Sequence, residues 1–203
     1  MRREAQLARL AFAVPLLYFG TLFAAAATWP GYSHVTQYAS ELGSAAAPRP
    51  EIFNNGIIAM GVVCVFAAAG LFLAAIRAGG RPVWTALGAL CIGLFGISMV
   101  MGGMFPMPNP LHGGFGLGFA QVFAPLFLAL ALRGRERMGA LVATLLASFV
   151  FMAATITVMM GVGHLVTRAN VGLWQRANAL AMFPWMAVAG FVLSRRVEEL
   201  DGR

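Results

Sequence analysis

The longest charge-free stretch of the chain runs from residue 82 to residue 132, between Arg81 and Arg133. As one α-helix at 1.5 Å per residue this stretch would be roughly 75 Å long, more than twice the ~30 Å hydrocarbon core of a bilayer. It is interrupted by Pro106, Pro108 and Pro110, and prolines so closely spaced cannot continue a helix. The stretch therefore predicts two membrane-spanning helices joined by a short polar hairpin, which leads into His112.

The composition of the whole chain agrees with a membrane protein. Hydrophobic residues make up 60% of the sequence and charged residues only 10%, whereas about a quarter of a soluble domain is charged. We therefore predict an all-α integral membrane protein in which residues 1–203 form one domain, a compact bundle of six transmembrane helices. The expected spans cover about residues 9–29, 55–76, 82–104, 113–132, 139–162 and 177–194.

The arginines predict how this bundle crosses the membrane. All 14 basic residues are arginines, and eleven of them lie near the two termini or in the turns around residues 77–81 and 133–137. Arg49, Arg168 and Arg176 fall on the opposite side. The positive-inside rule then places both termini and both short turns in the cytoplasm.

The net charge of +7 is explained by this orientation. No basic run alternates with aromatic residues as an RNA-binding surface requires, so no nucleic-acid partner is expected. The use of Arg without any Lys, together with many Ala and Gly residues, is typical of a GC-rich bacterial genome. We therefore expect the protein in the inner (plasma) membrane of a bacterium.

The first span has an alternative interpretation. A basic start, an apolar stretch and four alanines at residues 24–27 could also form a cleaved signal peptide. The apolar stretch is long for such a peptide, and its removal would leave an odd number of spans and reverse the C-terminus. Cys64 and Cys91 fall near the middle of the second and third spans, where we expect small buried apolar residues.

The polar residues gather on the extracytoplasmic side. All three histidines lie there, so a site would open outward; they are His34, His112 and His164. The first outer loop, about residues 30–53, is too long for a plain connection. Within it Ser33 can cap a short helix that ends at Gly43. Its apolar face would consist of Val35, Tyr38, Ala39 and Leu42, as expected for an interfacial helix over the mouth of the bundle.

A single outward-facing pocket follows from this arrangement. The end of the interfacial helix, the start of the second span and the start of the fourth span should meet at one depth. The predicted head-group pocket consists of Ser40, Glu41, Asn54, His112 and Arg176. Because a charge near hydrocarbon is usually paired or lines a wet cavity, we expect an ion pair between Glu41 and Arg176.

Metal ligation is an alternative use of the histidines. Zinc held by His34, His112 and His164, with Glu41 as the base, would leave the open position that catalytic zinc needs. No two histidines have the i, i+4 spacing of a helical zinc pair, however. Methionines near the same face are soft ligands suited to copper, although methionines in helices more often pack. We expect no cofactor, with zinc or copper as alternatives and haem disfavoured because the histidines lie at the rim.

Several motifs carry a resemblance to a known family. They are Tyr38-Ala-Ser-Glu-Leu-Gly43, Pro50-Glu-Ile-Phe-Asn-Asn-Gly56, Phe105-Pro106, His112 and Gly172-Leu-Trp-Gln-Arg176. In their order and positions the chain resembles a bacterial family of six-span membrane proteins known as domain of unknown function 998. More distantly, Ser40-Glu-Leu-Gly43 and His112 are similar to features of autophagy-modulator and GPI-anchor-remodelling membrane proteins, which implies a lipid-related setting.

Three classes of function are compatible with these features. The first is a non-enzymatic protein whose outer, histidine-containing pocket binds a lipid head group or a membrane-protein partner, including a second copy of the chain. The second is a metal-dependent hydrolase or acyl-transfer enzyme acting on membrane lipids. The third is a small transporter, which a missing internal repeat and the lack of a mid-membrane acid disfavour, or else a copper- or haem-binding protein. The sequence favours the first class.

Overall fold

The computed structural model describes residues 3–202, so Arg2 and Arg203, which count among the predicted cytoplasmic arginines, lie outside the described residues. The described chain is helical and contains no strand. Its α-helices are α1 (Arg3–Arg9), α2 (Ala13–Ala26), α3 (Pro50–Arg77), α4 (Pro82–Met104), α5 (Ala124–Leu132), α6 (Gly139–Met159), α7 (Val171–Met182) and α8 (Pro184–Asp201). Its 3-10 helices are η1 (Leu10–Phe12), η2 (Ala39–Gly43), η3 (Pro110–Val122) and η4 (Val162–His164).

Six helical stretches of the described chain are long and apolar enough to cross a membrane, which confirms the predicted all-α fold with six spans. They cover Arg3–Ala26, Pro50–Arg77, Pro82–Met104, Pro110–Leu132, Gly139–Met159 and Val171–Asp201. The third span has the predicted bounds, and the others shift by several residues. The largest difference is in the last span, which begins at Val171 rather than 177 and therefore includes Arg176 within a helix.

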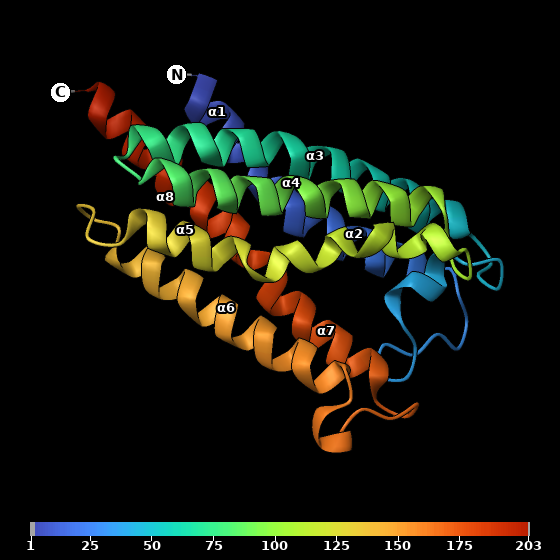
Figure 1. Cartoon of the computed structure of the whole chain (residues 1–203). Helices are drawn as coiled ribbons and strands as arrows, with labels where there is room; N and C mark the ends of the chain where they lie inside the picture. Colours follow the sequence, from blue (N-terminus) through green and yellow to red (C-terminus); the bar gives the residue numbers. More distant parts are fainter. Residues whose placement is uncertain (1–2, 203) are drawn as a thin grey trace.

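Both termini lie at one end of the bundle, together with the arginine-rich turns after α3 and α5 (Figure 1). Ion pairs link the elements at this end: Arg9 to Glu198 at 2.6 Å, and Arg77 to Asp201 at 2.9 Å. The opposite end carries residues 27–49, the hairpin before η3 and residues 160–170, and hence all three histidines (Figure 1). Most of the arginines therefore lie at the end of the bundle opposite to the histidines, as the sequence predicts.

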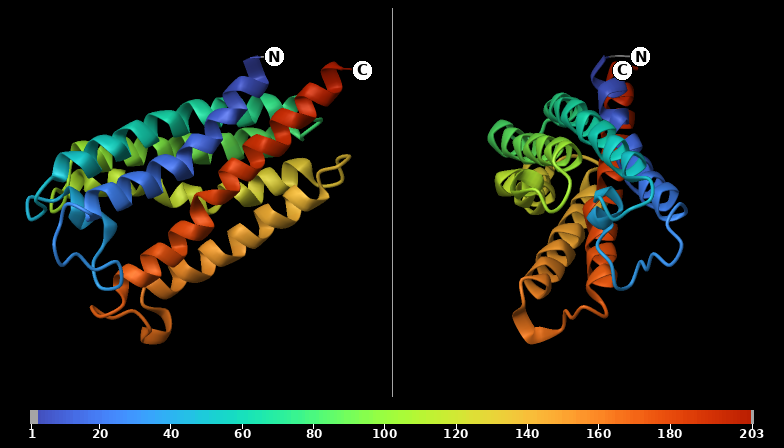
Figure 2. Two further views of the ribbon diagram at one scale, coloured as in Figure 1. Left: turned by 180° about the vertical axis from the view of Figure 1, so that it is seen from behind. Right: turned by 90° about the vertical axis from the view of Figure 1, so that its right-hand side faces the viewer.

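Glycines allow the first spans to pack closely. A Cβ atom added to Gly61 of α3 would lie 2.6 Å from the Gly96 carbonyl oxygen, and one added to Gly96 of α4 would lie 2.7 Å from the Gly61 carbonyl oxygen. Small residues on both sides of a helix contact permit such backbone approach in membranes. Figure 2 shows α3, α4 and η3 side by side, whereas α6 and α7 lean away from them toward the histidine end.

The fourth span is not a continuous α-helix. Its half at the histidine end, η3, contains a left-handed turn in which Gly114, Phe115 and Gly116 have φ angles of 53°, 54° and 77°. A Cβ atom at Gly114 would lie 2.8 Å from the Ser98 hydroxyl oxygen, so glycine is needed for the close approach to α4 as well as for the turn. Irregular backbone at membrane depth is tolerated where protein buries it or where it lines a cavity.

The sixth span is also broken, between α7 and α8. Pro184 has no N–H group to donate to the carbonyl four residues earlier, and the helix restarts with this proline at its first position. Gln121, which is fully buried at the junction of η3 and α5, donates from Nε2 to the Met182 carbonyl at 3.4 Å. The two broken spans therefore contact each other at their breaks.

Candidate functional site

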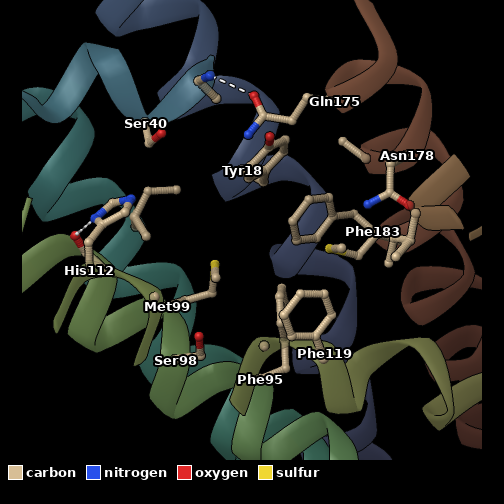
Figure 3. Close-up of a pocket in the computed structure, with 18 of the residues that line it drawn as sticks. Tyr18, Ser40, Phe95, Ser98, Met99, His112, Phe119, Gln175, Asn178 and Phe183 are labelled. Atoms are coloured by element: carbon tan, nitrogen blue, oxygen red, sulfur yellow. Dashed lines mark hydrogen bonds between the residues drawn. The ribbon is translucent and has the colours of Figure 1, made fainter. Parts of the chain in front are cut away.

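A cavity of about 480 Å³ lies at the histidine end of the bundle, between α3, α4 and η3 on one side and α6 and α7 on the other. Its volume falls within the ~300–1,000 Å³ typical of small-molecule sites. The walls are largely aromatic and thioether: Phe53, Phe95, Met99, Phe119, Met159, Met160, Met182 and Phe183. The polar lining residues are Tyr18, Ser40, Ser98, His112, Gln175 and Asn178 (Figure 3).

Three of the polar side chains lie where η2 covers the cavity. Gln175 accepts a hydrogen bond from the Ala39 backbone N–H at 2.6 Å through Oε1, and Figure 3 shows its amide beside the Tyr18 hydroxyl. Ser40, in η2 itself, donates to the Met107 sulfur at 3.1 Å. His112 lies opposite them at the start of η3 (Figure 3). This end of the cavity can therefore hydrogen-bond a polar group.

Two further polar residues are buried deeper in the spans. Asn178 of α7 is 7% exposed; its Oδ1 accepts from the Thr155 hydroxyl at 2.8 Å, and its amide nitrogen faces the cavity in Figure 3. Ser98 of α4 is 3% exposed and lies against Gly114 and Gly118. Polar groups within transmembrane segments are costly unless they are paired or face a cavity. The position of both residues in its lining therefore favours a binding site over a gap in the packing.

The cavity opens between η3 and α6. Phe119 of η3 and Met160, directly after α6, line it and yet remain 59% and 74% exposed. Phe119 belongs to the fourth candidate span, and Met160 directly follows the fifth. The opening is therefore flanked by exposed apolar side chains of two candidate spans, or directly next to them, rather than by charged residues.

His112 contacts the end of α4 through its ring nitrogen Nδ1. Nδ1 lies 3.1 Å from the Gly102 carbonyl oxygen and 3.0 Å from the Phe105 carbonyl oxygen. This anchors the imidazole at the wall of the cavity and fixes its orientation.

Comparison with known proteins identifies the family. A family model described as protein of unknown function (DUF998) matches residues 12–192, nearly the whole chain. The chain belongs to the DUF998 family. No curated protein and no solved structure matches it. With six apolar helices, this DUF998 member is a multi-pass membrane protein, and the resemblance seen in the sequence motifs is confirmed.

The structure separates the residues predicted for one pocket in this DUF998 protein. Ser40 and His112 line the cavity, whereas Glu41, Asn54 and Arg176 do not. Asn54 instead donates from Nδ2 to the Gly43 carbonyl at 2.9 Å, which ties the end of η2 to α3. These three residues lie around the cavity as supports of the first outer loop.

The predicted ion pair between Glu41 and Arg176 is wrong. Glu41 accepts from the Tyr38 backbone N–H at 2.7 Å and from the Gln37 amide at 3.1 Å. Arg176 donates to the Gln37 carbonyl at 2.7 Å and to the Tyr32 hydroxyl. Both side chains therefore hold the loop through Gln37: the carboxylate accepts from groups of its own turn, and the guanidinium donates to neutral acceptors.

The helix predicted from Ser33 to Gly43 is present only as its last turn, η2. Residues 33–37 form a single turn, closed by the Gln37 backbone N–H, which donates to the Ser33 carbonyl at 3.0 Å, and Tyr38 is extended. Side-chain bonds supplement this turn: Gln37 Oε1 accepts from the Ser33 N–H at 2.8 Å, and Glu41 accepts from the N–H of Tyr38. Local side-chain bonds of this kind compete with helix formation.

The three histidines do not form a group. His34 packs between the rings of Phe23 and Tyr32, with centroid distances of 5.6 and 5.1 Å, whereas His112 faces the cavity and His164 lies in η4. Residues 3–202 contain no cluster of three or more His, Cys, Asp or Glu side chains that could hold a metal ion. The set of zinc ligands predicted from the sequence is therefore not brought together in the described residues.

The environment of His34 predicts a pH-dependent stability. Burial, and then the nearby Arg176 charge, lower the pKa of His34 below its ordinary value near 6.5. The unfolded chain then binds a proton more readily than the folded one, so stability is highest above pH 6.5 and falls as the pH drops below it. We expect the His34→Phe variant to lose less thermal stability between pH 7.5 and 5.5 than the unmodified protein. An equal loss in both proteins would contradict this role of His34; His164→Gln is the control that should keep the loss.

Tyr18, Ser98, Gln175 and Asn178 were not part of the predicted pocket. The signal for Ser98 and Asn178 is their presence as polar residues within otherwise apolar segments, since such residues usually face the interior of a bundle. For Tyr18 no comparable signal exists, because a tyrosine in a span packs equally well against other helices. Gln175 lies outside the predicted sixth span, which begins at residue 177. In the structure α7 begins at Val171 and therefore includes Gln175.

Proposed function

We propose that this DUF998 protein binds an amphiphilic lipid of the bacterial inner membrane in the cavity between η3 and α6–α7. The observation that carries the proposal is that the cavity lining is apolar along most of its walls and polar at one end. Aromatic and methionine side chains form most of the walls, and Ser40, His112 and Gln175 lie together at the end covered by η2. A lipid has the same division between chain and head group.

The opening of the cavity supports the same assignment. Its exposed flanking residues, Phe119 and Met160, are apolar, so a lipid chain can enter from the bilayer without crossing a polar rim. The apolar walls make the chain, and not only the head group, part of what is recognised. A purely polar ligand would leave most of the lining without a favourable contact.

Binding is better supported than metal-dependent hydrolysis. The hydrolase alternative needs several metal ligands at one place, and the described histidines lie in three separate environments. Binding needs only the cavity and its polar end.

Filling the cavity is the test of this proposal. Met99 of α4 points into the cavity in Figure 3, so in Met99→Trp the indole should occupy the space of the lipid chain. A ligand at a hundredfold excess over its Kd stabilises a protein by about 2.7 kcal/mol. We expect inner-membrane lipids, added back to delipidated protein in detergent, to raise the Tm of the unmodified protein but not that of Met99→Trp.

Met104→Trp is the matched control on the same helix, because Met104 is 59% exposed and does not line the cavity. It should keep the full rise in Tm. An equal rise in both tryptophan variants would show that the lipids act on the outer surface, and the proposed cavity site would be wrong.

A further inference from the structure

The imidazole of His112 donates to a carbonyl at the end of α4 that has no helical N–H partner. The carbonyl of Gly102 would normally accept from the N–H four residues later, but that residue is Pro106, which has none. His112 Nδ1 lies 3.1 Å from this oxygen and 3.0 Å from the Phe105 carbonyl oxygen. Because carbonyl oxygens only accept hydrogen bonds, Nδ1 must carry the proton.

The position of this proton determines what Nε2 can do. In a neutral imidazole protonated at Nδ1, Nε2 carries a lone pair and can only accept a hydrogen bond. Figure 3 shows the ring with one nitrogen at the carbonyl and the other turned toward the cavity. Within residues 3–202 no group donates to Nε2, so this acceptor is left for a ligand.

The charge of the lining limits the ligand further. The residues that line the cavity include no Asp, Glu, Lys or Arg. Arg176 follows the lining residue Gln175 in the sequence, and its guanidinium donates to the Gln175 amide oxygen at 3.0 Å, to the Gln37 carbonyl and to the Tyr32 hydroxyl, so neutral acceptors hold it behind the lining. A charged head group within the cavity would therefore meet no charged lining residue, and burying an unpaired charge is costly.

From these two constraints we infer the class of ligand, an inference that rests on the proposed function. We propose that the cavity selects a neutral lipid with a free hydroxyl on its head group, of the monoacylglycerol type, and that this hydroxyl donates to His112 Nε2. Ser40 and the Gln175 amide lie at the same end of the cavity and can bond to the remaining oxygens of the head group. A carboxylate or a methyl ester has no proton to offer to Nε2.

Three probes with the same acyl chain test the selection: monooleoylglycerol, methyl oleate and oleate at pH 8. Monooleoylglycerol is neutral and donates, methyl oleate is neutral and does not donate, and oleate is charged. The full chain, delipidated in detergent, is titrated with each probe. We expect monooleoylglycerol to bind on the order of tenfold more tightly than either of the others, the effect of one hydrogen bond to a buried acceptor.

The His112→Asn variant distinguishes the roles of the two imidazole nitrogens, because it replaces Nδ1 and removes Nε2. The asparagine amide can still donate to the Gly102 and Phe105 carbonyls, but nothing replaces Nε2. We expect this variant to bind monooleoylglycerol and methyl oleate with similar affinity, and oleate still more weakly, because its charge remains unpaired in the cavity. If it does not fold, the comparison of the three probes on the unmodified protein still decides the question.

The outcomes distinguish the inference from the proposed function. Equal binding of all three probes to the unmodified protein, tighter binding of oleate, or a preference for monooleoylglycerol over methyl oleate that persists in His112→Asn would overturn the inference about the head group and leave lipid binding intact. Binding of none of the three would overturn both.

Discussion

Replacement of Arg176 by methionine is expected to release the first outer loop from the bundle and to lower the free energy of unfolding by about 2–3 kcal/mol. The guanidinium donates to the Gln37 carbonyl at 2.7 Å, to the Gln175 amide oxygen at 3.0 Å and to the Tyr32 hydroxyl. Methionine keeps the length of the side chain but donates no hydrogen bond, so these partly buried acceptors would lose the bonds that tie the loop to α7. Thermal unfolding in detergent measures the loss, and chymotrypsin cleavage at the aromatic residues of the loop measures its release.

Glu41→Gln is the control for this prediction. The glutamine oxygen can still accept from the Tyr38 N–H, and no ion pair with Arg176 is lost. Its effect should therefore stay below about 1 kcal/mol, the usual value of one hydrogen bond. If the two variants were equally destabilised, an ion pair between Glu41 and Arg176 would be the better description of this region.

Leucine in place of Gly61 is expected to disrupt the packing of α3 against α4. The added Cβ would lie 2.6 Å from the Gly96 carbonyl oxygen and 2.9 Å from the Val100 backbone nitrogen, so relief requires the helices to separate. Overpacking of a tight contact costs typically 1–3 kcal/mol, and for a whole isobutyl group we expect about 3 kcal/mol or more. The yield of folded monomer and its Tm measure the effect.

Gly93→Leu provides the comparison on α4. A Cβ atom at Gly93 has nothing within 4 Å, so the leucine would extend into lipid or detergent. Replacement of glycine within a helix also removes its unfavourable propensity of about 1 kcal/mol. This variant should be at least as stable as the unmodified protein; a loss comparable to that of Gly61→Leu would mean that the contact of α3 with α4 is not the cause.

The spans could be predicted because they depend on local properties of the sequence. The charge-free stretch at residues 82–132, its three prolines and the arginines at its ends are sufficient to define two spans and their connection. The start of the last span was harder to predict from the sequence, because Gln175, Arg176 and Asn178 lower its hydropathy. These residues belong to the helix because the loop and the cavity satisfy them, which depends on elements distant in sequence.

The candidate site could be predicted only in part. Ser40 and His112 were found because polar residues at the ends of neighbouring spans must lie at one depth. Glu41 and Arg176 were expected to pair because both are charged, but local turns and backbone carbonyls supply their partners instead. The cavity itself arises from the left-handed turn at Gly114–Gly116 and from the divergence of α6 and α7, neither of which has a periodic pattern in the sequence.

Photo-crosslinking in the bilayer tests the central claim most directly, because it asks where a lipid chain resides. A lipid with a photoreactive group on its acyl chain is added to membranes that contain the protein, and the labelled peptides are mapped by mass spectrometry. If a lipid chain occupies the cavity, labelling should concentrate at the cavity walls, at Met99 and Phe119, and should be lost from Phe119 in Met99→Trp. Labelling no stronger at the walls than at exposed residues on other faces, such as Phe66 and Val150, would contradict it.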